Sequence, residues 1–370
     1  MARKKKFSKG LTLFLAVALL VVGCIVGYLG AAMYEAASFK SDEAPATLVQ
    51  GELQIHFLEL GNKYTGDCTY IKAGETDILI DAGSKTDSIA TISAYIDQYM
   101  TDEKLEYVIV THAHQDHYAG FTKRDGSLFD LYEVGTIIDF AMTNQDEDAS
   151  LYSKYIAERQ EEIGTDGITK HYTAKTWLET YEDGSIMLED SGVTMTILKS
   201  QFYENKSAHE NNYSVCTLFT YGDYNYLFTG DLEEDGEEYL VQMNELPEVD
   251  LYKAGHHGSK TSSSEALLEV VKPDIVCVCC CAGSPEYTKI DANQFPTQEF
   301  IDRIAPYTDK VYVTTLCIDY EAGTFQSMNG NIAVVTDKNG ITVNCGSGDS
   351  RVLKEWEWFK QHRTCPAAWQ

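Results

Sequence analysis

The stretch Thr111-His112-Ala113-His114-Gln115-Asp116-His117 places three histidines and one aspartate within six residues of a chain that has nine histidines. The preceding run, residues 105–110 (Leu-Glu-Tyr-Val-Ile-Val), is mainly apolar and predicts a buried strand that ends at this cluster. His112 and His114 have the same parity along an extended chain, so both imidazoles project to one side. Histidine and carboxylate groups at a strand end are typical of a metal site open to solvent, and they suit zinc, manganese or iron.

Three further strand-like runs end in polar residues of the same chemical kind. Residues 77–80 lead into Asp81-Ala82-Gly83, and residues 224–229 lead into Gly230-Asp231. Residues 250–254 lead into Gly255-His256-His257-Gly258-Ser259. Each end taken alone is compatible with an ordinary turn, but in this order around the histidine cluster they indicate one metal site.

With these motifs the chain resembles the metallo-β-lactamase superfamily and, within it, the extracellular hydrolase domain of ComEC-type competence proteins. The resemblance covers about residues 51–345. It rests on Phe57-Leu58-Glu59-Leu60-Gly61 with Gly66-Asp67, Asp81-Ala82-Gly83, the histidine cluster, Asn212-Tyr213-Ser214-Val215, Thr229-Gly230-Asp231 and His256-His257-Gly258-Ser259. It implies an α/β fold in which two central sheets lie between outer helices, a four-layer αββα sandwich.

The resemblance also implies two divalent metal ions, with zinc expected and manganese as the alternative. The first site takes His112, His114 and Asp231, and the second takes Asp116, His117, Asp231 and His256. His256 is preferred over His257 as the ligand because it follows Gly255 directly, which leaves His257 to face the substrate. The family's equivalent of Asp81 orients a ligand histidine from outside the metal's coordination shell.

One position departs from the pattern of true β-lactamases, which carry a third histidine for the first site. This chain has Asn211-Asn212 there. An amide is a weak metal ligand, so we expect the first ion to bind more loosely than the second. ComEC-type domains share this asparagine, so it does not by itself indicate an inactive enzyme. The alternative is that both asparagines only cap a loop.

The expected chemistry is hydrolysis by water activated at the metal ions. Asp116 is expected to act both as a ligand and as a proton acceptor. His257, with Ser259 nearby, would stabilise developing charge or protonate the leaving group. The chain has no G-x-S-x-G motif, P-loop or dinucleotide fingerprint, which excludes serine hydrolases, nucleoside triphosphatases and dinucleotide-dependent oxidoreductases.

The N-terminus predicts a membrane anchor. Basic residues 3–9 precede Leu11 to Tyr34, 24 residues without a charge. A helix of this length spans a hydrocarbon core of about 30 Å. The basic flank stays cytoplasmic under the positive-inside rule, which places the catalytic domain outside the cell. Val21-Val22-Gly23-Cys24 resembles a lipoprotein cleavage box, but the apolar run continues past it, so an uncleaved anchor is preferred.

These features divide the chain into five parts: a basic flank (1–10), a transmembrane anchor (11–34), a linker (35–50), the hydrolase domain (51–345) and a C-terminal tail (346–370). Residues 121–205 lie between motifs, and in this superfamily such a section supplies substrate-facing loops. The tail carries tryptophans that either pack as an amphipathic helix or remain loose. Residues 276–281 (Val-Cys-Val-Cys-Cys-Cys) read as a buried strand in which cysteine serves as a small apolar residue.

The net charge of the part of the chain beyond the predicted anchor favours some candidate substrates over others. Residues 41–370 carry 23 basic and 56 acidic side chains, a formal charge of −33. This charge opposes the binding of nucleic acid, whose recognition usually depends on lysine and arginine. The leading hypothesis is a membrane-anchored phosphodiesterase or nuclease. The alternatives are a surface hydrolase of phosphocholine or teichoic-acid-type esters, and a metal-binding interaction module without turnover. The oligomeric state and the natural substrate are not encoded in any recognisable motif.

Overall fold

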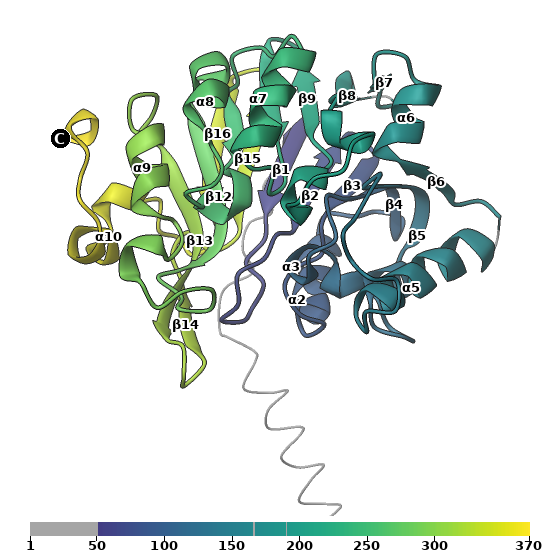
Figure 1. Cartoon of the computed structure of the whole chain (residues 1–370), viewed down its shortest axis with the longest axis horizontal. Helices are drawn as coiled ribbons and strands as arrows, with labels where there is room; N and C mark the ends of the chain where they lie inside the picture. The colour runs from purple at the N-terminus through teal and green to yellow at the C-terminus, as the bar shows by residue number, and fades with distance from the viewer. Residues whose placement is uncertain (1–50, 166, 190) are drawn as a thin grey trace, which may run out of the picture. The chain divides into compact units, whose positions relative to one another are not determined.

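The computed structural model describes residues 51–165, 167–189 and 191–370, which form two eight-stranded sheets (Figure 1). The first sheet has the order β16 (Gly340–Cys345), β15 (Ile332–Asp337), β1 (Leu53–Phe57), β2 (Thr69–Ala73), β3 (Thr76–Ile80), β4 (Lys104–Val110), β5 (Glu133–Asp139) and β6 (Lys170–Thr173). The second has the order β14 (Thr324–Ser327), β13 (Val311–Asp319), β12 (Ile275–Ala282), β11 (Leu251–Lys253), β10 (Tyr224–Phe228), β9 (Thr217–Tyr221), β8 (Val193–Ile197) and β7 (Ser185–Met187).

Both sheets are mixed. Strands β3 to β6 are parallel in the first sheet, and strands β10 to β13 are parallel in the second. The remaining neighbours are antiparallel. In each parallel set the carboxyl ends of the strands meet at one edge of the sheet, and the four motifs of the sequence lie at such ends.

The two sheets pack against each other through apolar and aromatic side chains. The rings of Phe57 and Phe228 stack with centroids 6.1 Å apart, and the hydroxyls of Tyr226 and Thr336 lie 2.6 Å apart. Every residue of β12 is buried. This is the pattern of a central strand covered on both faces, and it explains why four cysteines fit there as small apolar residues. All nine cysteines among the described residues are free thiols.

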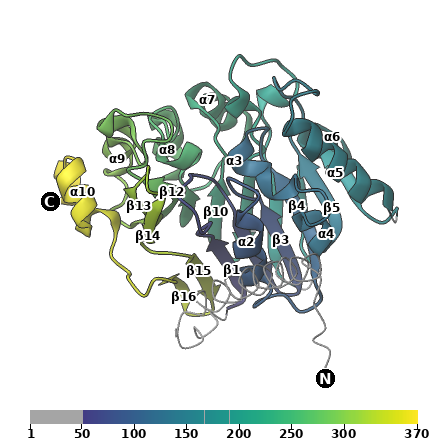
Figure 2. The same ribbon diagram turned by 90° about the horizontal axis from the view of Figure 1, so that it is seen from below.

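Helices cover the outer faces of the sheets. The α-helices are α2 (Ser88–Ile96), α3 (Gln115–Tyr118), α4 (Leu128–Leu131), α5 (Tyr152–Thr165), α6 (Ala174–Thr180), α7 (Glu234–Met243), α8 (Glu265–Val271), α9 (Gln298–Ile304) and α10 (Glu357–His362). The 3₁₀ turns are η1 (Ala119–Phe121), η2 (Gln201–Tyr203), η3 (Glu210–Tyr213), η4 (Gly255–Gly258), η5 (Asp291–Asn293), η6 (Leu353–Glu355) and η7 (Ala367–Trp369). Helices α7, α8 and α9 lie on one side of the sheets and α2 and α4 on the other (Figure 2).

The expectation of an α/β fold with two central sheets between outer helices is confirmed (Figure 2). Residues 121–205 are more regular than expected, because they contribute strands β5 and β6 to the first sheet and β7 and β8 to the second. Their apolar residues, such as Val134 and Ile137, are buried in the shared core.

The C-terminal residues 346–370 lie in the same compact unit as the two sheets, Leu48–Gln370. The segment is part of the apolar core that also contains the buried residues of α8 and α9. It contributes Leu353, Trp356, Phe359 and Trp369. The expected anchor, residues 11–34, and the linker lie outside the described residues. Among the residues that are described, no helix combines the length and apolarity needed to cross a bilayer.

Candidate metal centre

The four sequence motifs converge at one end of the two sheets. Asp81 follows β3 and His112 follows β4, two neighbouring parallel strands. Asp231 follows β10 and His257 follows β11, a second parallel pair. All four side chains are buried, with 0–1 % of their surface exposed. The strand ends therefore deliver imidazole and carboxylate groups from both sheets to one point.

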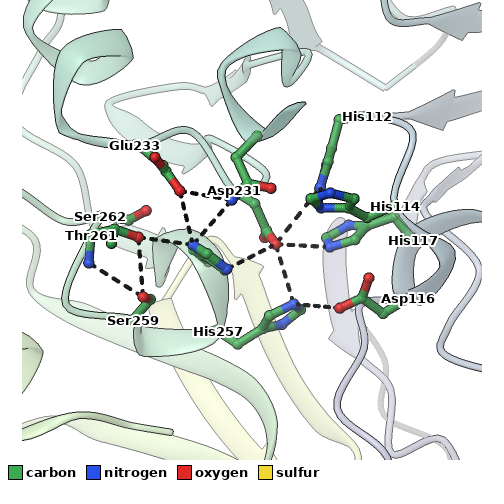
Figure 3. A network of polar contacts seen from close by, with 12 residues as sticks. His112, His114, Asp116, His117, Asp231, Glu233, His257, Ser259, Thr261 and Ser262 are labelled. Atoms are coloured by element: carbon green, nitrogen blue, oxygen red, sulfur yellow. Dashed lines mark hydrogen bonds and ion pairs between the residues drawn. The ribbon is translucent and has the colours of Figure 1, made fainter. Parts of the chain in front are cut away.

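Asp231 lies at the centre of this arrangement (Figure 3). Its Oδ2 atom is 3.1 Å from His117 Nε2, 3.3 Å from His257 Nε2 and 3.9 Å from His112 Nε2. His112 Nε2 is in turn 3.0 Å from His114 Nδ1. A carboxylate in this position can bridge two ions, which is the role expected for Asp231.

The structure distinguishes the two consecutive histidines after β11. His257 is 1 % exposed, and its Nε2 lies 3.3 Å from an oxygen of Asp116 and 3.3 Å from an oxygen of Asp231. His256 is partly exposed, and its Nδ1 is 3.0 Å from the hydroxyl of Thr261. His256 Nε2 also lies near this carboxylate, 3.9 Å from Asp231 Oδ2. Because His257 is closer and more deeply buried, we infer that His257 is the ligand and that His256 faces the cavity, the reverse of the assignment made from the sequence.

The cause of this reversal is the backbone of η4. His256 and His257 both have positive φ, 47° and 55°. Two successive residues in the left-handed region turn the chain sharply, and this is uncommon for residues other than glycine. The turn directs the second histidine inward, so proximity to Gly255 in the sequence does not indicate which imidazole reaches the centre.

Buried acceptors orient the histidines. Asp81 Oδ2 is 2.7 Å from His117 Nδ1, and Asp81 also accepts hydrogen bonds from the amide and hydroxyl of Thr111. Because Nδ1 is engaged, Nε2 of His117 is the nitrogen that faces Asp231. His257 Nδ1 is in turn 3.0 Å from the carbonyl oxygen of Cys279 and 3.1 Å from an oxygen of Asp67.

Asp67 also forms a buried ion pair with Lys253, the last residue of β11. Burial opposes the ionisation of Asp67, but the charges of Lys253 and His257 outweigh it and hold the pKa of this carboxyl below its ordinary value. The pKa of Lys253 is correspondingly raised above its ordinary value, since the nearby carboxylates outweigh its burial. Nothing in the sequence singled out Lys253, because a lysine inside a strand gives no signal of its buried partner.

The electrostatics of the centre favour ionised carboxylates. Burial alone would raise the pKa of Asp231, but His117, His257 and His256 hold it well below the ordinary value. Asp116 is likewise held below its ordinary pKa, since contact with His257 and the charge of His117 outweigh its burial. The pKa values of His117 and His257 are raised well above normal because Asp231 outweighs their burial. The buried negative charge therefore requires cations, either protons or a metal ion.

Two buried oxygens of the centre, Asp231 Oδ1 and Asn211 Oδ1, have no hydrogen-bond partner among the described residues, and His257 Nε2 has only its ion-pair contacts with Asp116 and Asp231. Buried polar atoms are normally satisfied, so orphaned atoms at one place indicate a missing ligand. Asp116, His117, Asp231 and His257 each offer one ligand atom, and these atoms lie within 4.8 Å of one another. Two imidazole nitrogens and two carboxylate oxygens match the donor set that zinc prefers.

Asn211 and Asn212 have different environments. Asn212 accepts the amide of Glu233 and donates to Ser207, so both ends of its side chain hold loops together. Asn211 donates to Glu233 and leaves its own oxygen unpaired at the cavity wall. Asn211 is therefore the amide that can face an ion at the first site, and Asn212 fits the capping alternative.

Ser259 does not reach the cavity. Its hydroxyl is 3.1 Å from that of Thr261 and accepts the Thr261 amide, so it stabilises the turn after η4. It is 5 % exposed and is not among the residues that line the cavity. Of the three residues expected in catalysis, Asp116 and His257 meet at the centre and Ser259 does not.

An open cavity of about 510 Å³ lies over the centre. It is lined by Thr65, Ser84, Lys85, His114, Gln115, Asp116, Asn211, Asp231, His256, Glu286 and Tyr287. Among the described residues, 121–205 contribute no side chain to this wall, although Thr143 and Asn144 hold the loop of Asn211 through Glu210. The expectation that this section supplies the substrate-facing loops is therefore not met at this cavity.

Tyr287 is the cavity residue that sequence reasoning missed most clearly. It is 56 % exposed, and its hydroxyl donates a 2.8 Å hydrogen bond to Asp116 Oδ2. Its ring lies 5.6 Å from that of Phe295, which in turn contacts the rings of His256 and His257. These residues come from the loop after β12, a section without any recognisable motif.

Residues 61–123 and 206–282 match the model of the metallo-beta-lactamase superfamily. Recombination protein 2 of Haemophilus influenzae is 31% identical over 117 residues, 32% of this chain and 14% of that protein. ComE operon protein 3 of Bacillus subtilis is 38% identical over 66 residues, 18% of this chain and 8% of that protein.

Among solved structures, the metallo-beta-lactamase fold protein YhfI from Bacillus subtilis aligns with a TM-score of 0.42 and 13% identity, covering 74% of this chain and 99% of that one. The resemblance of this chain to the metallo-β-lactamase superfamily, and within it to ComEC-type proteins, is confirmed. The two matched segments contain every residue assigned above to the metal centre. The chain spans only a small fraction of the length of the curated relatives it matches.

Proposed function

We propose that this chain is a metal-dependent phosphodiesterase, anchored in the membrane by residues 11–34 with its catalytic domain outside the cell. The observation that carries the proposal is the buried group Asp116, His117, Asp231 and His257 at the base of an open cavity. Metallo-β-lactamase-like proteins are usually metal-dependent hydrolases. The unpaired buried oxygens of Asp231 and Asn211 support the same chemistry here.

Asp116, His117, Asp231 and His257 would hold one ion. His112, His114 and Asp231, with the oxygen of Asn211 close by, would hold the second more weakly, since an amide is a poor substitute for a third imidazole. When bound, such ions polarise a phosphoryl oxygen and bring the pKa of water toward neutrality. Zinc is the expected ion and manganese the alternative.

The chain's own residues supply positioning and proton transfer. Asp116 has one oxygen between His257 Nε2, at 3.3 Å, and the hydroxyl of Tyr287, at 2.8 Å, so it is held at the edge of the cavity where it can accept a proton. His256 lines the opposite wall, and Thr261 fixes its ring. Its position allows it to donate a hydrogen bond to a phosphate oxygen or to the leaving group.

The decisive experiment is a substrate panel with the full chain in detergent micelles. Bis-p-nitrophenyl phosphate, p-nitrophenylphosphorylcholine and single-stranded DNA are tested with chelator and after re-addition of zinc or manganese. We expect turnover of the diester that is lost with chelator and restored by metal. Turnover of the choline ester alone would favour the surface-esterase alternative, and bound metal without any turnover would favour an interaction module.

A further inference from the structure

A row of alternating lysine and tyrosine side chains lies beside the metal centre. The Nζ atom of Lys85 is 4.6 Å from the ring centroid of Tyr64. Lys63 Nζ is 5.5 Å from the same ring and 4.2 Å from the ring of Tyr320. The four residues come from three separate segments: the loop after β1, the loop after β3 and the turn between β13 and β14. Only the fold brings them together.

The row is continuous with the cavity. Lys85 lines the cavity wall together with Asp116 and His114, and Thr65, the neighbour of Tyr64, lines it as well. The row therefore begins at the mouth of the metal centre and extends outward to the β13–β14 turn. A substrate whose reacting phosphate lies over Asp231 can place its adjacent group along these residues.

The two ammonium groups are available to an anion. Among the described residues, neither Lys63 nor Lys85 forms an ion pair, although Lys85 interacts electrostatically with Glu286, which lines the same cavity. Lys63 donates a 2.7 Å hydrogen bond to the carbonyl oxygen of Tyr320. This bond fixes the direction of the ammonium group but gives it no anionic partner. The tyrosine rings hold both cations in place through cation–π contacts. In a unit with a strong negative charge, this is a local site for an anionic group.

We propose that Lys63, Tyr64, Lys85 and Tyr320 form a binding subsite for a second phosphate of the substrate, next to the phosphodiester that is hydrolysed. This inference rests on the proposed function and narrows it to substrates with at least two phosphate groups. The same chemistry occurs in a nucleic-acid backbone and in a polyol-phosphate polymer. The two sources differ in the nucleobase, which only the nucleic acid carries.

The row is unsuited to a choline ester. A quaternary ammonium group binds the faces of aromatic rings, where the negative part of the quadrupole attracts it. Here two ammonium groups lie over those faces at 4.2 and 4.6 Å. A third cation would meet like charges at short range. The arrangement thus favours a phosphate-rich substrate over the phosphocholine alternative.

The test uses two substrates that differ by one phosphate: the 5′-p-nitrophenyl phosphate ester of thymidine, with and without a 3′-phosphate. The double variant Lys63→Gln/Lys85→Gln is compared with the wild type and with Lys338→Gln. Lys338 is an exposed lysine in the turn after β15, at the opposite end of the first sheet. We expect the double variant to raise KM for the bisphosphate about tenfold, with KM for the monophosphate and both kcat values unchanged within about twofold.

A binding measurement separates this proposal from the proposed function. Thymidine 3′,5′-bisphosphate and glycerol 1,3-bisphosphate are titrated into metal-loaded protein by calorimetry, which requires no turnover. A loss of affinity of about tenfold in the double variant supports the subsite even if no diester is hydrolysed. Tighter binding of the thymidine ligand than of the glycerol ligand to the wild type indicates nucleic acid, and equal affinities indicate a polyol-phosphate source. Unchanged affinity in the double variant, or absence of binding to the wild type, would overturn the subsite.

Discussion

At the scale of single residues, the consecutive histidines His256 and His257 have different chemical roles because the backbone between them is left-handed. His257 is buried between two carboxylates, whereas His256 faces the cavity. We therefore predict that His257→Ala removes the ion held with Asp116, while His256→Ala keeps its metal content and loses turnover. Metal analysis after dialysis, together with turnover of bis-p-nitrophenyl phosphate, checks both variants.

The difference in metal content between the His256→Ala and His257→Ala variants tests the assignment of the two histidines. Loss of metal from His256→Ala with full metal in His257→Ala would restore the assignment based on the sequence alone. Asn212→Ala serves as a control for loop damage, since that residue joins loops without facing the centre.

The buried pair of Lys253 and Asp67 supports His257 from behind. We predict that Lys253→Met destabilises the protein by about 3–5 kcal/mol, because it leaves the charge of Asp67 buried without its ammonium partner. The double variant Lys253→Met/Asp67→Asn should recover much of this loss, since no lone charge remains. Chemical denaturation of the metal-loaded proteins measures both. A double variant that is no more stable than the single one would contradict this reasoning.

From the burial of the His56 imidazole we predict that the stability of the protein depends on pH, and that this dependence does not involve the metal centre. His56 lies on β1 under α2, where burial lowers its pKa from 6.5 to about 3 and its Nδ1 is 2.9 Å from the hydroxyl of Tyr95. The unfolded chain binds a proton below about pH 6.5, whereas the folded chain does not until about pH 3. The contribution of neutral His56 to the free energy of unfolding is therefore fully present above about pH 6.5, and it is lost as the pH falls from there toward about 3.

From about pH 7.5 to about pH 5 this residue should account for a loss of about 2 kcal/mol in the free energy of unfolding. We predict that His56→Phe reduces the pH dependence by this amount, whereas His362→Gln, a change at an exposed histidine, does not. Denaturation at both pH values measures the difference. Equal pH dependence in His56→Phe and the wild type would exclude His56 as its source.

At the scale of elements, the C-terminal segment with η6, α10 and η7 belongs to the same apolar core as helices α8 and α9. Trp369 is 4 % exposed, its ring centroid lies 5.7 Å from that of Phe359 in a tilted arrangement, and it donates a 2.8 Å hydrogen bond to the carbonyl oxygen of Thr308. We predict that Trp369→Ala lowers the free energy of unfolding by about 3–5 kcal/mol without a change in metal affinity. Gln361→Ala, at an exposed position of α10, is the matched control. A Trp369→Ala protein of wild-type stability would show that this segment adds nothing to the core.

At the scale of the whole molecule, the proposed topology predicts where the catalytic domain is accessible. If residues 11–34 remain as an anchor with the basic flank inside, protease added to cells stripped of their wall should remove the catalytic domain. Immunoblotting against the domain and against a cytoplasmic marker measures this. Mass spectrometry of the mature N-terminus separates the two modes of attachment, because cleavage after Gly23 would leave a protein that begins at Cys24. A domain that survives protease on intact cells and is cut only after lysis would contradict the outward orientation.

The sequence by itself determined the strand ends that carry ligands and the family that the chain resembles. Motifs such as Asp81-Ala82-Gly83 and the histidine cluster are local: a buried strand followed by a polar turn is written in consecutive residues. The order of these motifs indicated a shared metal centre, and the family resemblance they carry implied two central sheets between outer helices. The all-apolar pattern of β12 likewise identified a strand buried on both faces.

Only the tertiary structure decided which side chain does what at the centre. The left-handed turn of η4 brings His257 closer to Asp231 than His256, the unpaired oxygen distinguishes Asn211 from Asn212, and Ser259 contacts its own turn and not the cavity. Tyr287, Lys253 and the row from Lys85 to Tyr320 depend on contacts between segments far apart in the chain. Such contacts have no local pattern, because burial, charge pairing and ring packing are set by the sheets that bring the segments together.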